Sequence, residues 1–202
     1  MTAIPKRKYS LEEYFEIERT SEEKYEYWDG NVWSMAGASP EHERIVLNTG
    51  AHLRELLRGR GCSVFGSNLK VGVPAYPPYR YPDLSAYCGR GVYETIGGLD
   101  VLTNPQMLVE VLSPSTEAFD RGEKFTYYKS IESFTEYLLI AVNRPHATQF
   151  VKLNEREWLQ REALGLDGKL FSPAFEIEML LSEIYLDVEF PEPSPNLFLI
   201  DR

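Results

Sequence analysis

The chain has 202 residues, which is enough to bury a proper core in one large domain or two small ones. Its 43% apolar and 26% charged residues are ordinary for a globular protein. It contains neither an apolar run of about eighteen residues, as a membrane span requires, nor the apolar core of a signal peptide, so we expect a cytoplasmic protein outside the membrane. The 31 acidic and 21 basic residues give a net charge of −10, which argues against a protein that binds duplex DNA through a broadly basic surface.

Local signals predict a helix and then a hairpin in the first part of the chain. Ser10 followed by Glu13 is the pattern of a capping box, which predicts a helix directly after it. Over residues 25–35 aromatic and polar residues alternate around Asp29-Gly30, a dipeptide that favours a tight hairpin turn. Glu26 in this hairpin either serves the sheet or faces a site as an extra acid.

A second helix is predicted from Ser39 as N-cap and Pro40 at the first helical position. The apolar stripe over residues 45–57 makes it a core helix. His42 lies in its first turn and has two readings: it contacts a phosphate or a metal-bound water, or it is a hydrogen-bonding residue of the structure alone.

Strands and connectors follow. Residues 62–73 predict a strand bent at Gly66, residues 74–80 a rigid proline-rich connector, and residues 84–88 a strand headed by Asp83. The glycine-rich stretch 89–105 is expected to be a long loop of the kind that overhangs a site.

The two cysteines, Cys62 and Cys88, form no Cys-x-x-Cys pair and have no nearby histidine to complete a zinc site. We therefore expect both to be small apolar side chains that fill the core on strands.

Glu110 interrupts an apolar run that extends from Met107 to Leu112. Such a run is typical of a strand covered on both faces. An ionised and unpaired Glu there would cost several kcal/mol, on the order of the cost of burying any isolated charge, so a cation is expected beside it. If the strand after Asp83 is a neighbour, the two carboxylates also make a site for a divalent cation that prefers oxygen ligands.

Besides a divalent cation shared with Asp83, Lys124 is a candidate cationic partner of Glu110. It lies in a predicted helix and shares the apolar face with Tyr127, Tyr128 and Ile131. A lysine on the buried side of a helix either extends past the sheet edge, neutralises Glu110 in a structural ion pair, or takes part in chemistry.

Two features flank this helix. The hydroxyls of Ser113 and Thr116 follow the strand of Glu110, where they either bind a substrate phosphate or only shape the turn. Asp120 and Glu123 have the spacing of a capping box, which assigns Asp120 a structural role at the start of the helix.

The remaining chain predicts a buried strand over residues 134–142, a pair of strands over 148–153 and 158–162, and a short strand with a last helical turn over 169–184. The tail 191–202 is expected to be loosely held. No repeat or linker divides the chain, so one domain over residues 1–202 is the expected organisation.

Five motifs resemble those of a known family: Y-E-Y-W-D-G at 25–30, A-G-A-S-P-E-H at 36–42, Y-P-D at 81–83, V-E-V-L-S-P-S-T at 109–116 and D-R-G-E-K-F at 120–125. Together they resemble the Uma2 family of restriction-endonuclease-like proteins (the DUF820 group), in the PD-(D/E)xK nuclease superfamily, over about residues 10–190. The resemblance implies an α/β fold of mixed α+β type. Its core would be restriction-endonuclease-like, with a central mixed β-sheet flanked by helices and an N-terminal helix and β-hairpin.

The resemblance also implies a site. In the superfamily the lysine usually follows the second acid by two residues on the same strand, a position that Leu112 occupies here, whereas in Uma2 proteins it lies on the following helix, which matches Lys124. The implied catalytic residues are Asp83, Glu110 and Lys124, with His42 as a further candidate. The implied ligands of Mg²⁺ or Mn²⁺ are Asp83, Glu110 and the backbone carbonyl of Val111.

The expected function is that of a metal-dependent endonuclease that hydrolyses DNA phosphodiester bonds, and family analogy implies a homodimer because two strand breaks need two sites. Two alternatives remain open. One is a non-catalytic interaction or regulatory module with a structural Glu110–Lys124 pair, which the net charge favours. The other is a metal-dependent hydrolase of RNA or of a small phosphoester, favoured by the lack of a basic run.

Overall fold

The structure is a computed structural model that describes residues 7–35, 37–114 and 116–190. The tail 191–202, predicted to be loosely held, lies outside the described residues. Within them, no helix combines the length and the apolar character that crossing a bilayer requires.

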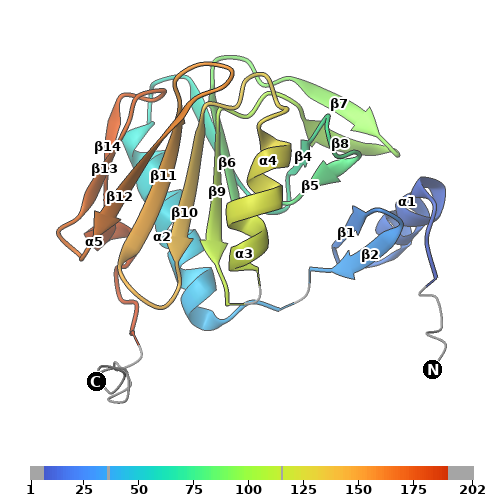
Figure 1. Cartoon of the computed structure of the whole chain (residues 1–202), viewed down its shortest axis with the longest axis horizontal. Helices are drawn as coiled ribbons and strands as arrows, with labels where there is room; N and C mark the ends of the chain where they lie inside the picture. Colours follow the sequence, from blue (N-terminus) through green and yellow to red (C-terminus); the bar gives the residue numbers. More distant parts are fainter. Residues whose placement is uncertain (1–6, 36, 115, 191–202) are drawn as a thin grey trace, which may run out of the picture.

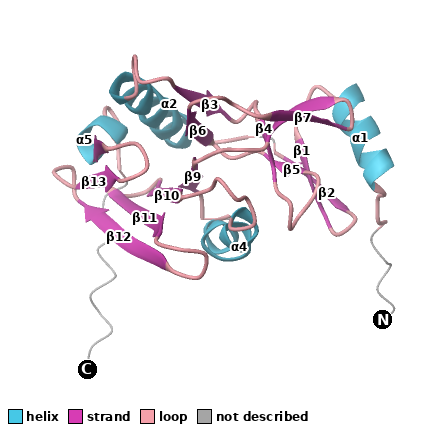
Figure 2. Cartoon of the chain, turned by 90° about the horizontal axis from the view of Figure 1, so that it is seen from above, coloured by secondary structure: helices cyan, strands magenta, loops and turns pink. Residues whose placement is uncertain are grey.

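A six-stranded mixed sheet forms the centre of the molecule, with the strand order β12-β11-β10-β9-β6-β3 (Figure 2). Only β9 and β10 run parallel in this sheet; the other neighbours are antiparallel. The strands are β3 (Cys62–Gly66), β6 (Leu84–Cys88), β9 (Met107–Leu112), β10 (Glu136–Ala141), β11 (His146–Lys152) and β12 (Trp158–Leu164). The predicted central mixed sheet is thus confirmed.

Helices cover both faces of this sheet (Figures 1 and 2). On one face lies α2 (Pro40–Leu56), which begins as predicted with the Ser39 side chain accepting a hydrogen bond from the His42 amide. On the other face lies a continuous helical segment made of α3 (Glu117–Phe119), the π-helical turn η1 (Asp120–Lys124) and α4 (Phe125–Tyr128). Because both faces are covered, every residue of β9 is buried, as its apolar run predicts.

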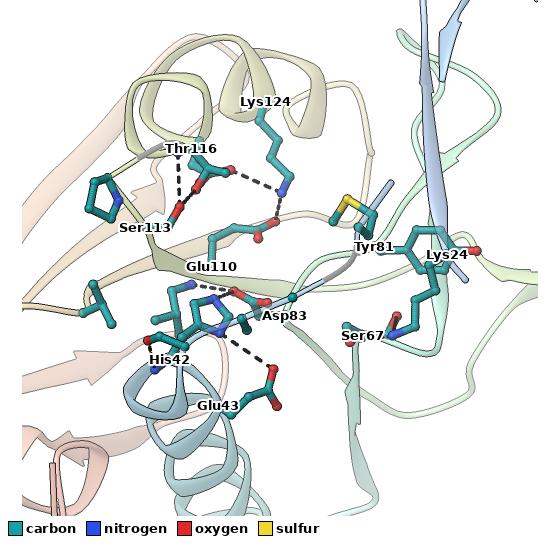
Figure 3. A pocket seen from close by; sticks show the side chains of 18 of the residues that line it. Lys24, His42, Glu43, Ser67, Tyr81, Asp83, Glu110, Ser113, Thr116 and Lys124 are labelled. Carbon is teal, nitrogen blue, oxygen red and sulfur yellow. Dashed lines mark hydrogen bonds and ion pairs between the residues drawn. The ribbon is translucent and has the colours of Figure 1, made fainter. Parts of the chain in front are cut away.

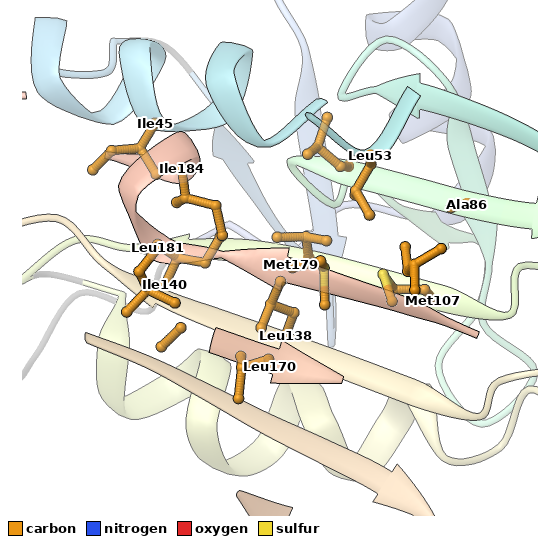
Figure 4. Close-up of a cluster of buried hydrophobic side chains, with 14 of the residues drawn as sticks. Ile45, Leu53, Ala86, Met107, Leu138, Ile140, Leu170, Met179, Leu181 and Ile184 are labelled. Atoms are coloured by element: carbon orange, nitrogen blue, oxygen red, sulfur yellow. The ribbon is translucent and has the colours of Figure 1, made fainter. Parts of the chain in front are cut away.

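The larger core cluster lies between α2 and the sheet (Figure 4). Ile45 and Leu53 of α2 pack towards side chains of the strands, including Met107 and Leu138. Three short elements complete this side: β13 (Lys169–Ser172), β14 (Ile177–Leu180) and α5 (Leu181–Ile184). The packing fixes α2, and with it His42, over the end of the sheet that carries the candidate site.

The N-terminal elements pack beside a second sheet. They are α1 (Leu11–Thr20), β1 (Tyr25–Trp28) and β2 (Asn31–Ser34), and the second sheet has the order β5 (Tyr79–Arg80), β4 (Lys70–Gly72), β8 (Leu99–Leu102), β7 (Tyr93–Ile96). The predicted capping box at Ser10 is present. The turn at Asp29-Gly30 joins β1 to β2 with positive φ at both residues, as a tight hairpin requires. The tyrosine rings of Tyr14, Tyr27 and Tyr79 join these elements into a third apolar cluster.

Three predictions for this part of the chain are wrong. Residues 62–73 are not one bent strand, because a turn after Gly66 divides them into β3 of the central sheet and β4 of the second sheet. Residues 89–105 are not one loop, because they contain the β7–β8 hairpin, turned by Gly97 and Gly98 at positive φ. This hairpin does not line the pocket described below. Cys62 and Cys88 are not separate core thiols, because they face each other across β3 and β6 and form a disulfide.

Candidate active site

The pairing of β6 with β9 brings the two predicted carboxylates together. The register aligns Leu84 with Val109, so the next position along each strand is Asp83 on one and Glu110 on the other. The Val111 amide donates a hydrogen bond of 2.7 Å to Oδ2 of Asp83, which fixes that carboxylate beside the end of β9. The expectation that the two strands are neighbours is therefore confirmed.

Glu110 is almost fully buried and has the cationic neighbour that its burial requires. Its Oε1 lies 2.7 Å from Nζ of Lys124 and accepts a second hydrogen bond, of 2.8 Å, from the Tyr128 hydroxyl. Both partners come from the helical segment that crosses this face of the sheet. Figure 3 shows the Lys124 side chain extending from this segment to Glu110. Lys124 therefore does not extend past the sheet edge; it contacts the carboxylate directly.

Asp120 is a further member of this group, and its predicted role as a helix cap is wrong. The helical segment begins at Glu117, and no side chain of the described residues caps it there. The π-helical turn instead places Asp120 and Lys124 at its two ends, both buried, with Oδ1 of Asp120 3.2 Å from Nζ of Lys124. Such turns often occur at functional sites.

Burial and charge shift the titration of this group in a consistent way. Burial raises the pKa of Glu110 well above its ordinary value; the charge of Lys124 opposes the shift, and the negative charges of Asp120 and Asp83 add to it. Burial disfavours a charged lysine, but the attraction of Glu110 and Asp120 outweighs it, so the pKa of Lys124 is also raised. The carboxylates thus crowd one another around a single ammonium group, a setting that attracts further positive charge.

His42 lies against the same carboxylates. Its Nε2 is 3.4 Å from Oδ2 of Asp83, and its Nδ1 is 4.0 Å from Oε1 of the exposed Glu43. Burial lowers the pKa of His42, but the hydrogen bond and charge of Asp83 more than compensate, helped by Glu43 and the Val111 carbonyl, so the pKa is raised. His42 is therefore placed where it can donate a hydrogen bond to Asp83.

The donor chemistry of the site fits a hard divalent cation. Asp83 and Glu110 each keep one carboxylate oxygen, Oδ1 and Oε2, that accepts no hydrogen bond from the described residues. Carboxylate and carbonyl oxygens are the ligands that Mg²⁺ and Mn²⁺ prefer, and Mg²⁺ usually keeps several waters. No group of three or more His, Cys, Asp or Glu side chains suited to a metal occurs among the described residues, so water would have to complete the coordination.

One pocket of about 500 Å³ is lined by His42, Asp83, Glu110, Asp120 and Lys124 (Figure 3). Ser113 and Thr116, whose hydroxyl oxygens are 3.0 Å apart, form one edge beyond the end of β9. The opposite side holds Lys24 and Ser67, which the sequence did not single out. The volume falls within the range of ligand-binding pockets, which supports a substrate site here.

Glu26 does not line this pocket. It is buried on β1, where Oε1 accepts a hydrogen bond of 3.0 Å from the Tyr81 amide and Oε2 lies 3.9 Å from Nε of the buried Arg80. Its charge nonetheless adds to the field around Lys124. Glu26 thus links the N-terminal hairpin to the segment that leads into Asp83.

The sequence prediction gave Asp120 the wrong role and did not single out Lys24, for different reasons. The four-residue spacing of Asp120 and Lys124 was a usable signal, because residues at that spacing share one face of a helix. Lys24 lies in a charged stretch of ordinary appearance, and only the folded hairpin brings it to the pocket.

Comparison with known proteins places the chain in a family. The Uma2 family model, described as "Putative restriction endonuclease", matches residues 11–189. The uncharacterized protein slr1290 of Synechocystis sp. is 34% identical over 157 residues, which cover 78% of this chain and 81% of that protein. The uncharacterized protein sll1609 of the same organism is 30% identical over 158 residues, with 78% and 89% covered.

A solved structure is similar in fold. It is the crystal structure of a putative nuclease belonging to DUF820 from Anabaena variabilis, with a TM-score of 0.65. The similarity covers 82% of this chain and 91% of the other at 15% sequence identity.

Proposed function

The chain belongs to the Uma2 family, and we propose that it is a metal-dependent nuclease that hydrolyses phosphodiester bonds of DNA. The observation that carries the proposal is the buried Glu110, which contacts Lys124 and lies beside Asp83 in a pocket open to a substrate. The DUF820 protein of similar fold is described as a putative nuclease, which supports the same activity class.

Asp83 and Glu110, with the backbone carbonyl of Val111, would hold the divalent ion. A bound Mg²⁺ or Mn²⁺ lowers the pKa of a coordinated water and offsets negative charge on the scissile phosphate. The chain's own part is to fix these oxygens: the Val111 amide holds Asp83, and the Tyr128 hydroxyl holds Glu110.

Lys124 would act on the phosphate or on the attacking water. Its ammonium is held between Glu110 and Asp120, so a compact positive charge is available at the end of β9. A charge fixed in advance in a poorly hydrated site stabilises a developing oxyanion without reorganisation. His42 would maintain the orientation of Asp83, since its Nε2 faces that carboxylate.

We expect the purified protein to cleave DNA when Mg²⁺ or Mn²⁺ is added, and Asp83→Asn and Glu110→Gln to abolish cleavage, because each removes a charge that the site requires. Both changes keep the shape of the side chain. The measurement is cleavage of a supercoiled plasmid and of a labelled oligonucleotide. Glu55→Gln is the matched control, since Glu55 is an exposed carboxylate on α2 whose one ion-pair partner in the described part of the chain is Arg58; it should leave cleavage unchanged. Retained cleavage in either site variant contradicts the assignment.

The buried ion pair also favours a second function. A Glu110–Lys124 pair that is complete in the folded chain is what a non-catalytic module with a structural ion pair would contain, and the net charge of −10 does not favour binding to duplex DNA. Under that function divalent ions neither bind nor support turnover of any phosphoester. A panel of DNA, RNA and small phosphodiesters separates this function from nuclease activity and identifies the substrate class.

A further inference from the structure

The pocket contains a lysine, Lys24, that forms no ion pair with a carboxylate of the described residues. Lys24 lines the same pocket as Asp83 and Glu110, but it comes from the segment between α1 and β1. Its Nζ bonds to the Ser67 side-chain oxygen at 3.0 Å and to the Ser67 carbonyl at 3.4 Å. Within the described residues no carboxylate oxygen lies within 4.0 Å of this nitrogen, whereas Lys124 has two carboxylate partners.

The surroundings of Lys24 fix it in place. Its backbone carbonyl accepts a hydrogen bond of 2.9 Å from the Met35 amide, which extends the β1–β2 ladder by one pair. Ser67 holds the ammonium group on the side of the turn between β3 and β4. Nζ also lies 6.0 Å from the centroid of the Tyr81 ring, at the outer limit of a cation–π contact. An ammonium group has three N–H donors, so two bonds to Ser67 leave one donor for a ligand.

Lys24 lies across the two carboxylates from the hydroxyls of Ser113 and Thr116. In Figure 3, Lys24 and Ser67 lie on one side of Asp83 and Glu110, and Ser113 and Thr116 lie on the other. A phosphate that reacts at the carboxylates would therefore have donors on both flanks. A small phosphodiester has only the reacting phosphate, whereas a nucleic-acid strand also carries neighbouring phosphates that need cationic partners.

We propose that Lys24 binds a non-reacting phosphate of the substrate next to the scissile one, and that the substrate is accordingly a nucleic-acid strand rather than a small phosphoester. This rests on the proposed nuclease function; it adds a substrate-binding residue to the same pocket and excludes a small phosphoester as the substrate. Ser67 orients the ammonium group, and the strand passes from Lys24 over Asp83 and Glu110 towards Ser113 and Thr116.

The test compares two substrates of one enzyme: a labelled single-stranded oligonucleotide and bis(4-nitrophenyl) phosphate, a diester without neighbouring phosphates. We expect Lys24→Ala to raise KM for the oligonucleotide about tenfold at low salt, with a smaller change in kcat, because a contact to a non-reacting phosphate contributes mainly to binding. Its turnover of the small diester should equal that of the wild type. The slope of log affinity against log salt should fall by about 0.7, the value of one single-strand phosphate contact.

Two further variants control for charge and for structure. Lys24→Arg keeps the cation and should restore most of the affinity for the oligonucleotide. Lys70→Ala removes a positive charge close to Lys24, because Nζ of Lys70 and Nζ of Lys24 lie 5.1 and 6.0 Å from the centroid of the same Tyr81 ring. Lys70 itself does not line the pocket. It should leave KM for the oligonucleotide near the wild-type value.

The outcomes are distinguishable. Equal KM values and salt slopes for wild type and Lys24→Ala contradict the assignment of Lys24 while leaving the nuclease function intact. An equal loss on both substrates would make Lys24 a structural residue and also contradicts it. Absence of turnover of either substrate by the wild type contradicts the proposed function, and the Lys24 proposal with it.

Discussion

Glu110 and Lys124 are buried ions that depend on each other. Each is about 95% shielded from solvent, with relative exposures of 4% and 5%. The pair gains Coulomb energy that the desolvation of both ions largely cancels, so it contributes little stability compared with apolar residues of the same size. Removing one partner strongly destabilises the fold, because the other charge then remains buried without compensation.

We therefore expect Lys124→Met to lower the free energy of unfolding by about 3–5 kcal/mol, since Glu110 and Asp120 would both lose their cation. Urea denaturation followed by circular dichroism measures this. Lys129→Met is the matched control: Lys129 directly follows α4 and is exposed, with Nζ 4.1 Å from the Phe125 ring centroid, and its loss should cost about 1 kcal/mol or less. Similar losses in both variants would contradict the account of the buried group.

The sequence predicted the cation beside Glu110 but not the other two members of the group, Asp120 and Tyr128. A lone carboxylate in a buried apolar strand requires a cationic partner in any fold, so Lys124 could be predicted as that partner from the sequence. Asp120 was named but given the wrong role, because the helical segment was predicted to begin at it, although its four-residue spacing from Lys124 was a usable signal. Three residues of α3 before it turn a predicted cap into a buried partner.

Among the elements, α2 is attached to the small C-terminal hairpin by a bond that depends on pH. Nε2 of His52 accepts a hydrogen bond of 3.2 Å from the Leu180 amide, which only the unprotonated ring can do. Burial lowers the pKa of His52, although the charge of Glu183 opposes the shift. A depressed pKa in the folded state means that the unfolded chain binds the proton more readily.

His52 therefore stabilises the folded state more at high pH than at low pH. The stability that His52 contributes is fully present above the ordinary histidine pKa of about 6.5 and is lost as the pH falls below it. We expect the wild type to lose more unfolding free energy between pH 7.5 and 5.5 than His52→Gln, whose amide oxygen accepts the same bond without titrating. Urea unfolding of both proteins at the two pH values is the measurement. Parallel losses would show that His52 carries no part of the dependence.

The elements were predicted well where local chemistry decides them. The capping box at Ser10, the Asp29-Gly30 turn and the Ser39 N-cap all depend on residues within a few positions of one another. The β7–β8 hairpin was missed because its exposed strand has no apolar face to reveal it. The Cys62–Cys88 bond was missed because it depends on the register of β3 and β6, which sequence spacing does not fix.

For the molecule as a whole, the net charge of −10 and the proposed substrate have to be reconciled. Acidic residues repel nucleic acid at long range, so binding has to depend on local cations and on a metal ion. The pocket supplies Lys24 and Lys124 from separate parts of the fold, and the carboxylates between them would be neutralised by the ion. We expect affinity to be modest and dependent on both salt and metal.

Binding of the divalent ion is the central claim, and thermal unfolding tests it without any substrate. The melting temperature of the wild type should rise on titration with Mg²⁺ or Mn²⁺, since a ligand that binds only the folded state adds about 2.7 kcal/mol at a hundredfold excess over its dissociation constant. The rise should be lost in Asp83→Asn and retained in Glu55→Gln. A wild-type melting temperature that does not respond to either ion, or an equal rise in Asp83→Asn, would contradict a metal site at these carboxylates.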